Sequence, residues 1–292
     1  MNPTFRRQAI SGWLFILPAF LGFVIFALLP LVRGVFISFT DWSLLNTPKS
    51  VGLSNYAALL HDSVFWKSLW NTAYYVLLMV PLQTFLALLM AVLLHTLTSS
   101  ALVRSVLILP YLVSGVVAGL LAVWLLHPSL GIVNHWLPLI GIPEQSFFGS
   151  SEQAMPSVVG VNLWRTLGYT SLFFFAGLQA IPRNIYEAAA IDGAGEVSQF
   201  FRVTVPLLRP ITAFVVVTGL IGSFQVFDTI AVTTGGGPGD ATRTILWYIY
   251  ENAFNRFNMG YATALSLALF LVVAVITALQ FRFLRAGSSD LA

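Results

Sequence analysis

The sequence contains no cysteine and very little charge. Charged residues make up only 9% of its 292 residues. The absence of cysteine excludes disulfides, thiolate metal sites and cysteine nucleophiles. A soluble globular domain carries about a quarter charged residues, so this chain cannot cover itself with a solvated surface. Together with a hydrophobic fraction of 58%, the low charge predicts an integral membrane protein.

Several kinds of chemistry are also missing. The glycine-rich run 235–239 lacks the Gly-Lys-Ser/Thr ending of a phosphate-binding loop. Metal-ligand spacing is absent from the four histidines, which are His61, His95, His127 and His135. The basic residues are dispersed, so the net charge of +3 does not indicate a nucleic-acid partner. We therefore expect a non-catalytic chain with no metal site and no cofactor of its own.

Long apolar segments dominate the chain. A bilayer core requires about 20 apolar residues per helix. Six segments qualify, and they are 11–38, 69–96, 104–126, 157–180, 206–230 and 261–282. The stretches between them hold the Asp, Asn, Pro and Gly residues that end helices. The sequence predicts an all-α, polytopic membrane protein with one domain over residues 1–292.

The basic residues indicate the orientation of these spans. An even number of spans places both termini on one side of the membrane. With the N-terminus inside, the short inner segments carry more Lys and Arg than the longer outer loops 40–67, 127–156 and 231–260. The apolar stretch that follows Arg6 and Arg7 is longer than the core of a cleavable signal peptide, which has about 7–15 residues. We expect this first span to be retained and both termini to be cytoplasmic.

The cytoplasmic segment 181–205 is charged and rich in small residues. Asn184 and Glu187 have the spacing of a capping box, in which each side chain bonds the backbone amide of the other. A helix from Ile185 to Asp192 would end at Gly193, because glycine adopts the left-handed conformation without a Cβ clash. The three alanines 188–190 would leave a narrow helix that a neighbouring protein can approach closely.

A second short helical turn is expected from Glu196 to Arg202, after which Thr204 and Pro206 would begin the fifth span. An isolated Glu-Ala-Ala can equally belong to a plain connector between two spans. The full pattern is more specific, and it consists of Glu187-Ala188-Ala189, Asp192-Gly193 and Val203-Thr204-Val205-Pro206. This pattern resembles the EAA loop of ABC importer permeases, although that family prefers Ile and Leu where Val203 and Val205 stand.

The resemblance extends along nearly the whole chain. Its other matching segments are Leu17-Pro18-Ala19, Ser38-Phe39-Thr40-Asp41-Trp42, Val51-Gly52-Leu53-Ser54-Asn55-Tyr56, Trp164-Arg165, Ala176-Gly177-Leu178-Gln179 and Thr233-Thr234-Gly235-Gly236-Gly237-Pro238. These segments are similar to carbohydrate uptake transporter family 1, and within it to the first permease subunit of maltose-type and glycerol-phosphate-type systems. The resemblance implies the type I ABC importer permease fold in the inner (plasma) membrane of a prokaryote.

This resemblance also implies partners and residue roles. The partners would be a second permease, two ABC ATPase subunits that bind ATP and Mg, an extracytoplasmic solute-binding protein and membrane lipid. The segment 181–205 would contain a coupling helix that docks on one ATPase. The residues with this implied coupling role are Glu187, Ala188, Ala189, Asp192, Gly193 and Pro206.

Polar side chains inside the predicted spans are candidates for the solute path. The first choices are Tyr111, Asn162, Arg165, Gln225 and Asp228. A charged group within a bilayer is costly and usually faces a protein interior or a water-filled cavity. Arg165 and Asp228 can alternatively form an ion pair that joins two helices, and the uncharged groups can be fasteners between helices.

Two other classes of function compete with the importer permease. An ion-coupled secondary transporter of a polar solute would need buried carboxylates or broken helices near the midplane of the bilayer. An intramembrane enzyme would need a nucleophile and a base at matching depth, and the sequence offers neither. The residues do not identify the solute, which can be a mono-, di- or oligosaccharide, a polyol, or a glycerol phosphate derivative.

Overall fold

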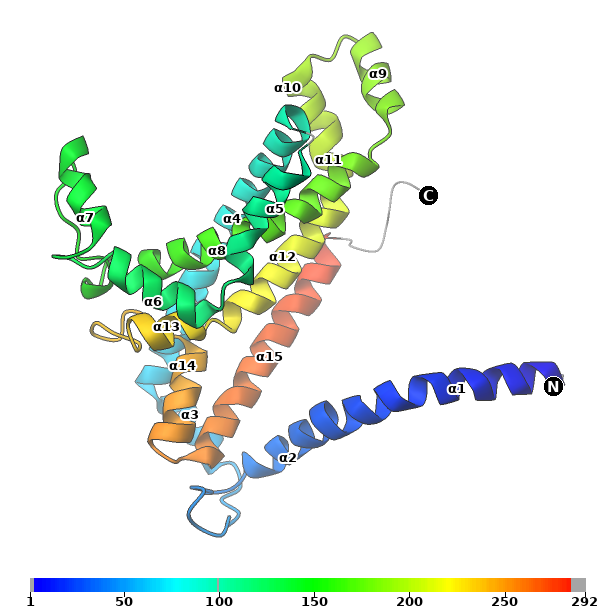
Figure 1. Ribbon diagram of the computed structural model, residues 1–292. Coiled ribbons are helices and arrows are strands. Elements are labelled where there is room, and N and C mark those ends of the chain that lie inside the picture. The colour runs from blue at the N-terminus through cyan, green and yellow to red at the C-terminus, as the bar shows by residue number, and fades with distance from the viewer. Residues whose placement is uncertain (1–2, 99, 285–292) are drawn as a thin grey trace. The chain divides into compact units, whose positions relative to one another are not determined.

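A computed structural model describes residues 3–98 and 100–284, and the ordered elements within them are helices (Figure 1). In this part of the chain, extended pairing is limited to an isolated bridge between Thr40 and Ser50. The predicted all-α class is therefore confirmed. Residues after 284, including Arg285, lie outside the described part.

Four described helical segments are long and apolar enough to cross a bilayer, and they are Gly12–Ile37, Ser63–Leu97, Arg209–Thr233 and Met259–Gln280. A fifth candidate is a pair of helices, α5 (Ala101–Leu112) and α6 (Gly115–Leu125), which meet at 90°. The predicted span 157–180 falls within α8 (Ala154–Ala180), a helix of 27 residues with many polar side chains. The number of six spans remains a prediction.

The continuous span predicted over 104–126 is wrong in its shape. Val113 and Ser114 have extended backbone torsions, with ψ angles of 132° and 141°, and they separate α5 from α6. Pro110 lies in the last turn of α5, where its missing N–H weakens the continuation of the helix. Each half is shorter than the roughly 30 Å bilayer core, because 12 residues extend only about 18 Å.

The described residues form two compact units. The first unit contains residues up to 62 together with 249–270, and the second contains residues 63–248 with those from 271 onward. The boundaries fall inside α14 (Ile245–Tyr250) and α15 (Met259–Leu284). The prediction of one domain remains untested.

The first unit is held together by hydrogen bonds around the end of its N-terminal helix. This helix comprises α1 (Pro3–Phe23), a π-helical segment (Val24–Leu28) and α2 (Leu29–Ile37). Asn55 lies in the first turn of α3 (Ser54–His61), and its Nδ2 donates to the carbonyls of Ser38 and Thr40, at 2.8 and 2.9 Å. At the start of α15, Gly260 approaches Thr40 so closely that a Cβ would lie 1.9 Å from the Thr40 carbonyl oxygen. The rest of this unit includes a π-helical turn, Glu251–Asn255.

The second unit is a helical bundle built on α4 (Ser63–Leu97) and α8, which pack along each other (Figure 1). The bundle also contains α12 (Arg209–Phe224), which packs on α4, and α13 (Asp228–Thr233), which packs on α6. Its smaller elements are α7 (Ile132–Trp136), the 3-10 turns Leu137–Ile140 and Phe147–Gly149, α9 (Arg183–Ile191), α10 (Glu196–Gln199), a π-helical turn (Phe200–Thr204) and α11 (Val205–Leu207). A core cluster that includes Ala87, Phe174 and Leu208 joins α4, α8 and the start of α12.

Glycines allow the closest helix contacts in this bundle. A Cβ on Gly168 would lie 1.7 Å from the carbonyl oxygen of Leu107, where α8 crosses α5. The Gly115 and Gly119 spacing predicts close helix approach. At Gly119 a Cβ would lie 2.5 Å from a methyl group of Val232, so α6 and α13 do approach closely there.

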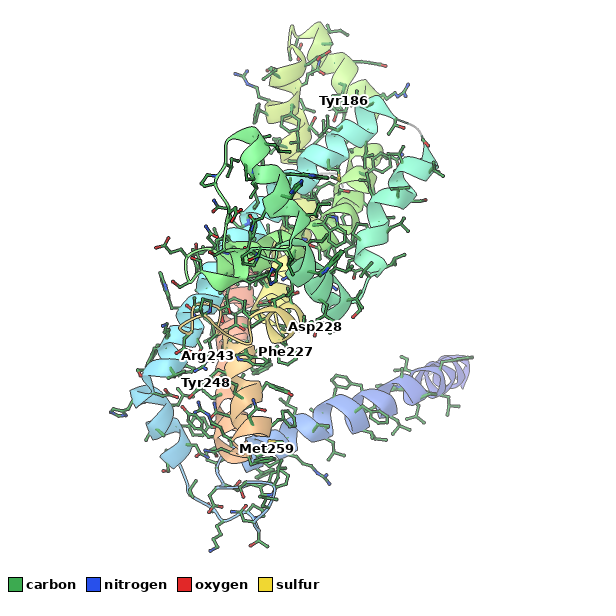
Figure 2. The ribbon with its side chains drawn as sticks, turned by 60° about the vertical axis from the view of Figure 1, so that its left-hand side comes forward. Tyr186, Phe227, Asp228, Arg243, Tyr248 and Met259 are labelled. Carbon is green, nitrogen blue, oxygen red and sulfur yellow. The ribbon has the colours of Figure 1, made fainter. Side chains whose placement is uncertain are left out.

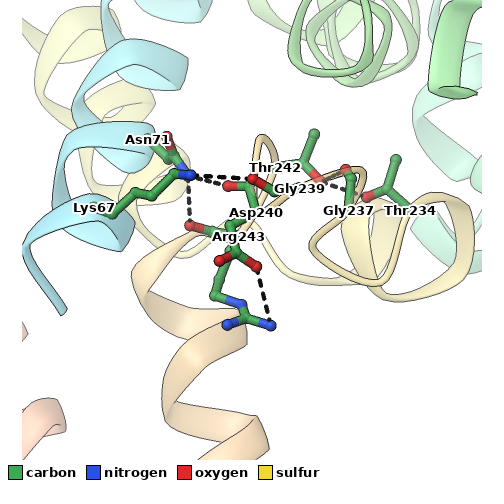
Figure 3. A network of polar contacts seen from close by, with 8 residues as sticks. All are labelled: Lys67, Asn71, Thr234, Gly237, Gly239, Asp240, Thr242 and Arg243. Atoms are coloured by element: carbon green, nitrogen blue, oxygen red, sulfur yellow. Dashed lines mark hydrogen bonds and ion pairs between the residues drawn. The ribbon is translucent and has the colours of Figure 1, made fainter. Parts of the chain in front are cut away.

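The loop that follows α13 is fastened to α4 (Figure 3). Asn71 donates from Nδ2 to the carbonyls of Asp240 and Arg243, at 2.7 and 3.1 Å. Lys67 donates from Nζ to the carbonyl of Gly239 at 3.1 Å. Within the loop, the hydroxyls of Thr234 and Thr242 are 2.6 Å apart. This glycine-rich segment is therefore a braced turn.

Candidate functional site

A cavity of about 340 Å³ lies in the second unit. Its walls come from α4, α5, α8, α12 and α13. All five of the solute-path candidates line it, and they are Tyr111, Asn162, Arg165, Gln225 and Asp228. The size falls within the range of ligand pockets, about 300–1,000 Å³. The structure therefore gathers the predicted residues at one place, and their role stays a prediction.

One stripe of α8 supplies much of the cavity wall. Asn162, Arg165, Tyr169 and Phe173 follow one another at spacings of three and four residues, which place side chains on one face of a helix. The first two side chains along this stripe carry an amide and a guanidinium group, and the next two carry aromatic rings. The wall therefore offers polar groups and apolar faces to one occupant.

Two aromatic rings from different helices meet on the cavity wall. Tyr111 of α5 and Tyr169 of α8 stack with ring centroids 4.1 Å apart and an interplanar angle of 5°. Tyr169 also contacts Phe173 edge to face, at 5.1 Å. The flat face of an aromatic ring suits the apolar face of a sugar ring, and the tyrosine hydroxyl adds a polar end.

Breaks in two helices meet beside the cavity. One is the turn at Val113 and Ser114, and the other is the segment 225–227 between α12 and α13. A Cβ on Gly115, the first residue of α6, would lie 3.0 Å from Oδ2 of Asp228. The first N–H groups of a helix lack intrahelical partners and carry partial positive charge, so this carboxylate is placed where a negative charge is favoured.

The predicted ion pair between Arg165 and Asp228 is not formed. Nη1 of Arg165 would lie 3.3 Å from the same Gly115 Cβ, so both charged groups approach one point. Among the described residues, however, no ion pair within 4.0 Å joins these two side chains. The carboxylate of Asp228 lies instead beside Gly115, the first residue of α6.

Two nitrogen atoms in the cavity wall have no hydrogen-bond partner among the described residues. They are Nδ2 of Asn162 and Nε of Arg165. The side chain of Asn162 is 6% exposed, and its Oδ1 accepts a hydrogen bond from Thr229 at 2.8 Å. A buried donor without a partner is costly. Gln83, by contrast, donates to Thr170 at 2.6 Å.

Several cavity residues were not identified from the sequence. They are mostly small hydroxyl and aromatic residues, namely Tyr75, Thr166, Thr170, Phe173, Thr218, Ser223, Phe227 and Thr229. Thr166, Thr170 and Phe173 follow Asn162 at spacings of three or four residues, so the helical period of α8 could have predicted that they share its face. Phe227 lies in the break before α13, which the sequence did not predict.

The segment 181–205 forms a second candidate site, and α9 is its main element. α9 runs from Arg183 to Ile191 and follows Pro182, whose backbone is extended. No side chain caps this start, so the predicted capping box of Asn184 and Glu187 is wrong. Pro182 occupies the N-cap position and its side chain has no acceptor, while Asn184 is already the second residue of the helix.

The end of α9 agrees with the prediction. Gly193 has a φ of +82°, and its N–H donates to the carbonyl of Ala190 at 3.0 Å. The N–H of Ala194 donates to the carbonyl of Ala189 at 2.9 Å. These two bonds form the Schellman motif, which requires a left-handed residue after the last turn. The predicted role of Gly193 as a helix terminator is confirmed.

α9 has an exposed face and an attached face. Glu187, Ala188 and Ala190 are exposed, and Ile191 is 87% exposed. On the other side, Ile185 and Tyr186 pack against the core cluster that contains Leu178 and Leu208. Asp192 is exposed and Pro206 lies in α11. The candidate coupling residues therefore surround a helix that is free on one side and packed on the other.

The apolar side chains Val197 and Phe201 extend this exposed surface, at 73% and 65% exposure, and the sequence interpretation did not include them. The fifth span was predicted to begin at Thr204 and Pro206. In the structure Leu208 interrupts the helix, and the apolar candidate span begins at Arg209. Pro206 and Pro210 both lack a backbone N–H, which favours such an interruption.

The chain matches known proteins over most of its length. Residues 50–286 match the family described as binding-protein-dependent transport system inner membrane component. A Bacillus subtilis protein named as the probable ABC transporter permease YurN is 34% identical over 98% of this chain and 99% of its own. The sulfoquinovosyl glycerol transport system permease SmoG of Agrobacterium fabrum is 35% identical over 88% of this chain and 84% of its own.

A third relative is the sn-glycerol-3-phosphate transport system permease UgpA of Yersinia enterocolitica, which is 38% identical over 80% of this chain and 79% of its own. The fold is also similar to that of a bacterial ABC transporter involved in the import of the acidic polysaccharide alginate. The TM-score is 0.83, with 24% identity over 97% of each chain. A related crystal structure contains this alginate transporter in complex with an alginate pentasaccharide-bound periplasmic protein, with a TM-score of 0.82 and 94% of each chain covered.

Proposed function

The chain belongs to the family of binding-protein-dependent transport system inner membrane components, and from this premise we propose that it couples a cytoplasmic ATPase to a solute path through α9. It is an ABC importer permease of the inner membrane. The observation that carries the proposal is the two-sided packing of α9. Its alanine face is exposed, while Ile185 and Tyr186 hold it against the bundle that lines the cavity.

The proposed assembly contains a second permease, two ABC ATPases and an extracytoplasmic binding protein. In it, ATP and Mg bind to the ATPases, and this chain contributes half of the translocation path. Both termini lie in the cytoplasm, on the same side as α9. Closure of the ATPases moves α9, and the attached helices α8 and α12 change the access to the cavity between them.

The solute is proposed to be a sugar or a related polar compound. The stacked tyrosines and the polar side chains of Asn162 and Arg165 line the same cavity, and together they suit a ligand with hydroxyl groups and an apolar ring face. The names of SmoG and UgpA, a sulfoquinovosyl glycerol and a glycerol phosphate permease, support this class. A ligand panel against the cognate binding protein will identify the compound.

An ion-coupled secondary transporter is the alternative. The broken helices beside the cavity match one of its expected features. The family match and the permease relatives favour the ABC importer instead. Uptake by proteoliposomes that contain the complete importer separates the two. The importer requires ATP on the side of the membrane where the ATPases lie, whereas the alternative transports solute with an ion gradient and no ATP.

The proposed docking of α9 is tested by a charge reversal at Glu187. Glu187→Lys is expected to leave membrane insertion intact and to reduce the ATPase that co-purifies with the permease, because an exposed carboxylate on the docking face is replaced by a cation. Glu144→Lys is the matched control, since it makes the same charge change at an exposed position of the loop before α8. Equal ATPase recovery and equal uptake in both variants would refute the docking role.

A further inference from the structure

Tyr186 lies on the attached face of α9, next to the exposed Glu187. Figure 2 shows Tyr186 on α9, away from Asp228 at the start of α13. The hydroxyl of Tyr186 is 2.9 Å from Oγ1 of Thr204, which belongs to the π-helical turn before α11. Thr204 is only 5% exposed. A side-chain hydrogen bond therefore joins the middle of α9 to a buried residue 18 positions later in the chain.

The surroundings of Thr204 make this contact well defined. Its hydroxyl also lies 3.5 Å from the carbonyl of Gln199, in the orientation of a weak donor. The tyrosine hydroxyl can then donate to Thr204 Oγ1, so each hydroxyl has a role. Gln199 in turn donates from Nε2 to the carbonyl of Ala194 at 2.9 Å, just after the end of α9. A series of hydrogen bonds made by the side chains of Tyr186, Thr204 and Gln199 thus joins α9 to the segment that follows it.

The consequence concerns the helices that line the cavity. α9 follows α8 after only Ile181 and Pro182, so any displacement of α9 reaches α8 through the backbone. The backbone path from α9 to α12 is longer, because 17 residues lie between Ile191 and Arg209, and the existing contact is the apolar packing of Ile185 and Tyr186 on the cluster that contains Leu208. The contact between Tyr186 and Thr204 adds a directional hydrogen bond to this packing, from α9 to the segment that leads into α11 and α12.

From this geometry we infer that Tyr186 is a positioning residue that, with Thr204, transmits the movement of α9 to α12 during transport. The inference rests on the proposed function of α9 as the coupling helix. It assigns to Tyr186 a role different from docking, because its hydroxyl points to Thr204 on the attached face and the docking face lies on Glu187 and Ala188. The ring keeps α9 packed, and the hydroxyl fixes its angle.

The test uses the complete importer with its ATPases and binding protein in proteoliposomes. The variants are Tyr186→Phe, Thr204→Val and the double variant, each of which removes a hydroxyl and preserves most of the packing. Two measurements are made, the amount of ATPase that co-purifies and the solute transported per ATP hydrolysed. Tyr74→Phe and Thr96→Val are the matched controls, since both residues are exposed on α4.

Each single variant is expected to keep the wild-type amount of ATPase and to lower the transport per ATP about fivefold, which corresponds to one hydrogen bond. The double variant should lose no more than either single variant, because both remove the same contact. Thr204→Ser should retain the wild-type ratio, since it keeps the hydroxyl.

Three results would overturn the inference: an unchanged ratio in the single variants, losses that add in the double variant, or loss of the ATPase together with transport. The last would assign the pair to folding or docking. If the wild-type permease itself retains no ATPase, the proposed function fails as well, so the two failures are distinguishable.

Discussion

The left-handed conformation of Gly193 allows a quantitative prediction. Its φ is +82°, and no atom lies within 4 Å of the position that a Cβ would occupy. A substitution there meets no steric obstacle, so its cost comes only from the backbone conformation. For an L-residue with a Cβ this cost is about 1–2 kcal/mol. Gly193→Ala is therefore expected to reduce the population of the observed α9 ending by up to roughly 5- to 30-fold.

The assay is the affinity of the purified permease, with its partner permease, for the isolated ATPase. A loss of the competent conformation raises the apparent dissociation constant by at most the same factor. Gly193→Asn should have a smaller effect, because asparagine tolerates the left-handed region better than alanine. Gly193→Leu is expected to resemble alanine, since the space around the position is open.

Gly195→Ala is the matched control for this series. Gly195 is also exposed and also has open space around a Cβ, but its φ is −69°, which any residue adopts. It should therefore bind the ATPase like the wild type. Equal affinities for the Gly193→Ala and Gly195→Ala variants would refute the argument that the left-handed ending presents α9 to its partner.

Two further predictions concern the bundle and the cavity. Gly168→Ala should prevent stable folding, because its Cβ would lie 1.7 Å from the Leu107 carbonyl oxygen, and the check is the yield of monodisperse permease against that of Gly160→Ala, which has open space. Asn162→Leu should preserve ATPase binding and reduce uptake about tenfold, since it removes a polar side chain from the cavity wall together with its hydrogen bond to Thr229. Normal yield in the first variant, or normal uptake in the second, would contradict these interpretations.

The features of segment 181–205 that depend on single residues could be predicted from the sequence. Gly193 ends α9 because only a residue that tolerates positive φ suits that position, and such a requirement is local. The solute-path candidates also converge, since helical periodicity and the cost of burying polar groups restrict where they can point.

What could not be predicted depends on contacts between distant segments. The bend at Val113 and Ser114 is accommodated by the packing of α6 on α13, and the local sequence contains only Pro110 as a signal. An ion pair between Asp228 and Arg165 was one of two alternatives, based on their charges and on their similar depth in the predicted spans. The actual neighbour of Asp228 is the start of α6, and a helix terminus contributes partial charge only once the bend exists.

The contact between Gly119 and Val232 has a mechanical consequence for the cavity. α6 and α13 are both short segments that follow a break, and they pack against each other without room for a methyl group. Neither can tilt alone without a clash or a void, and dense packing resists both. The pair should therefore move as one rigid body, so a displacement of α6 would be passed to the α13 side of the cavity wall.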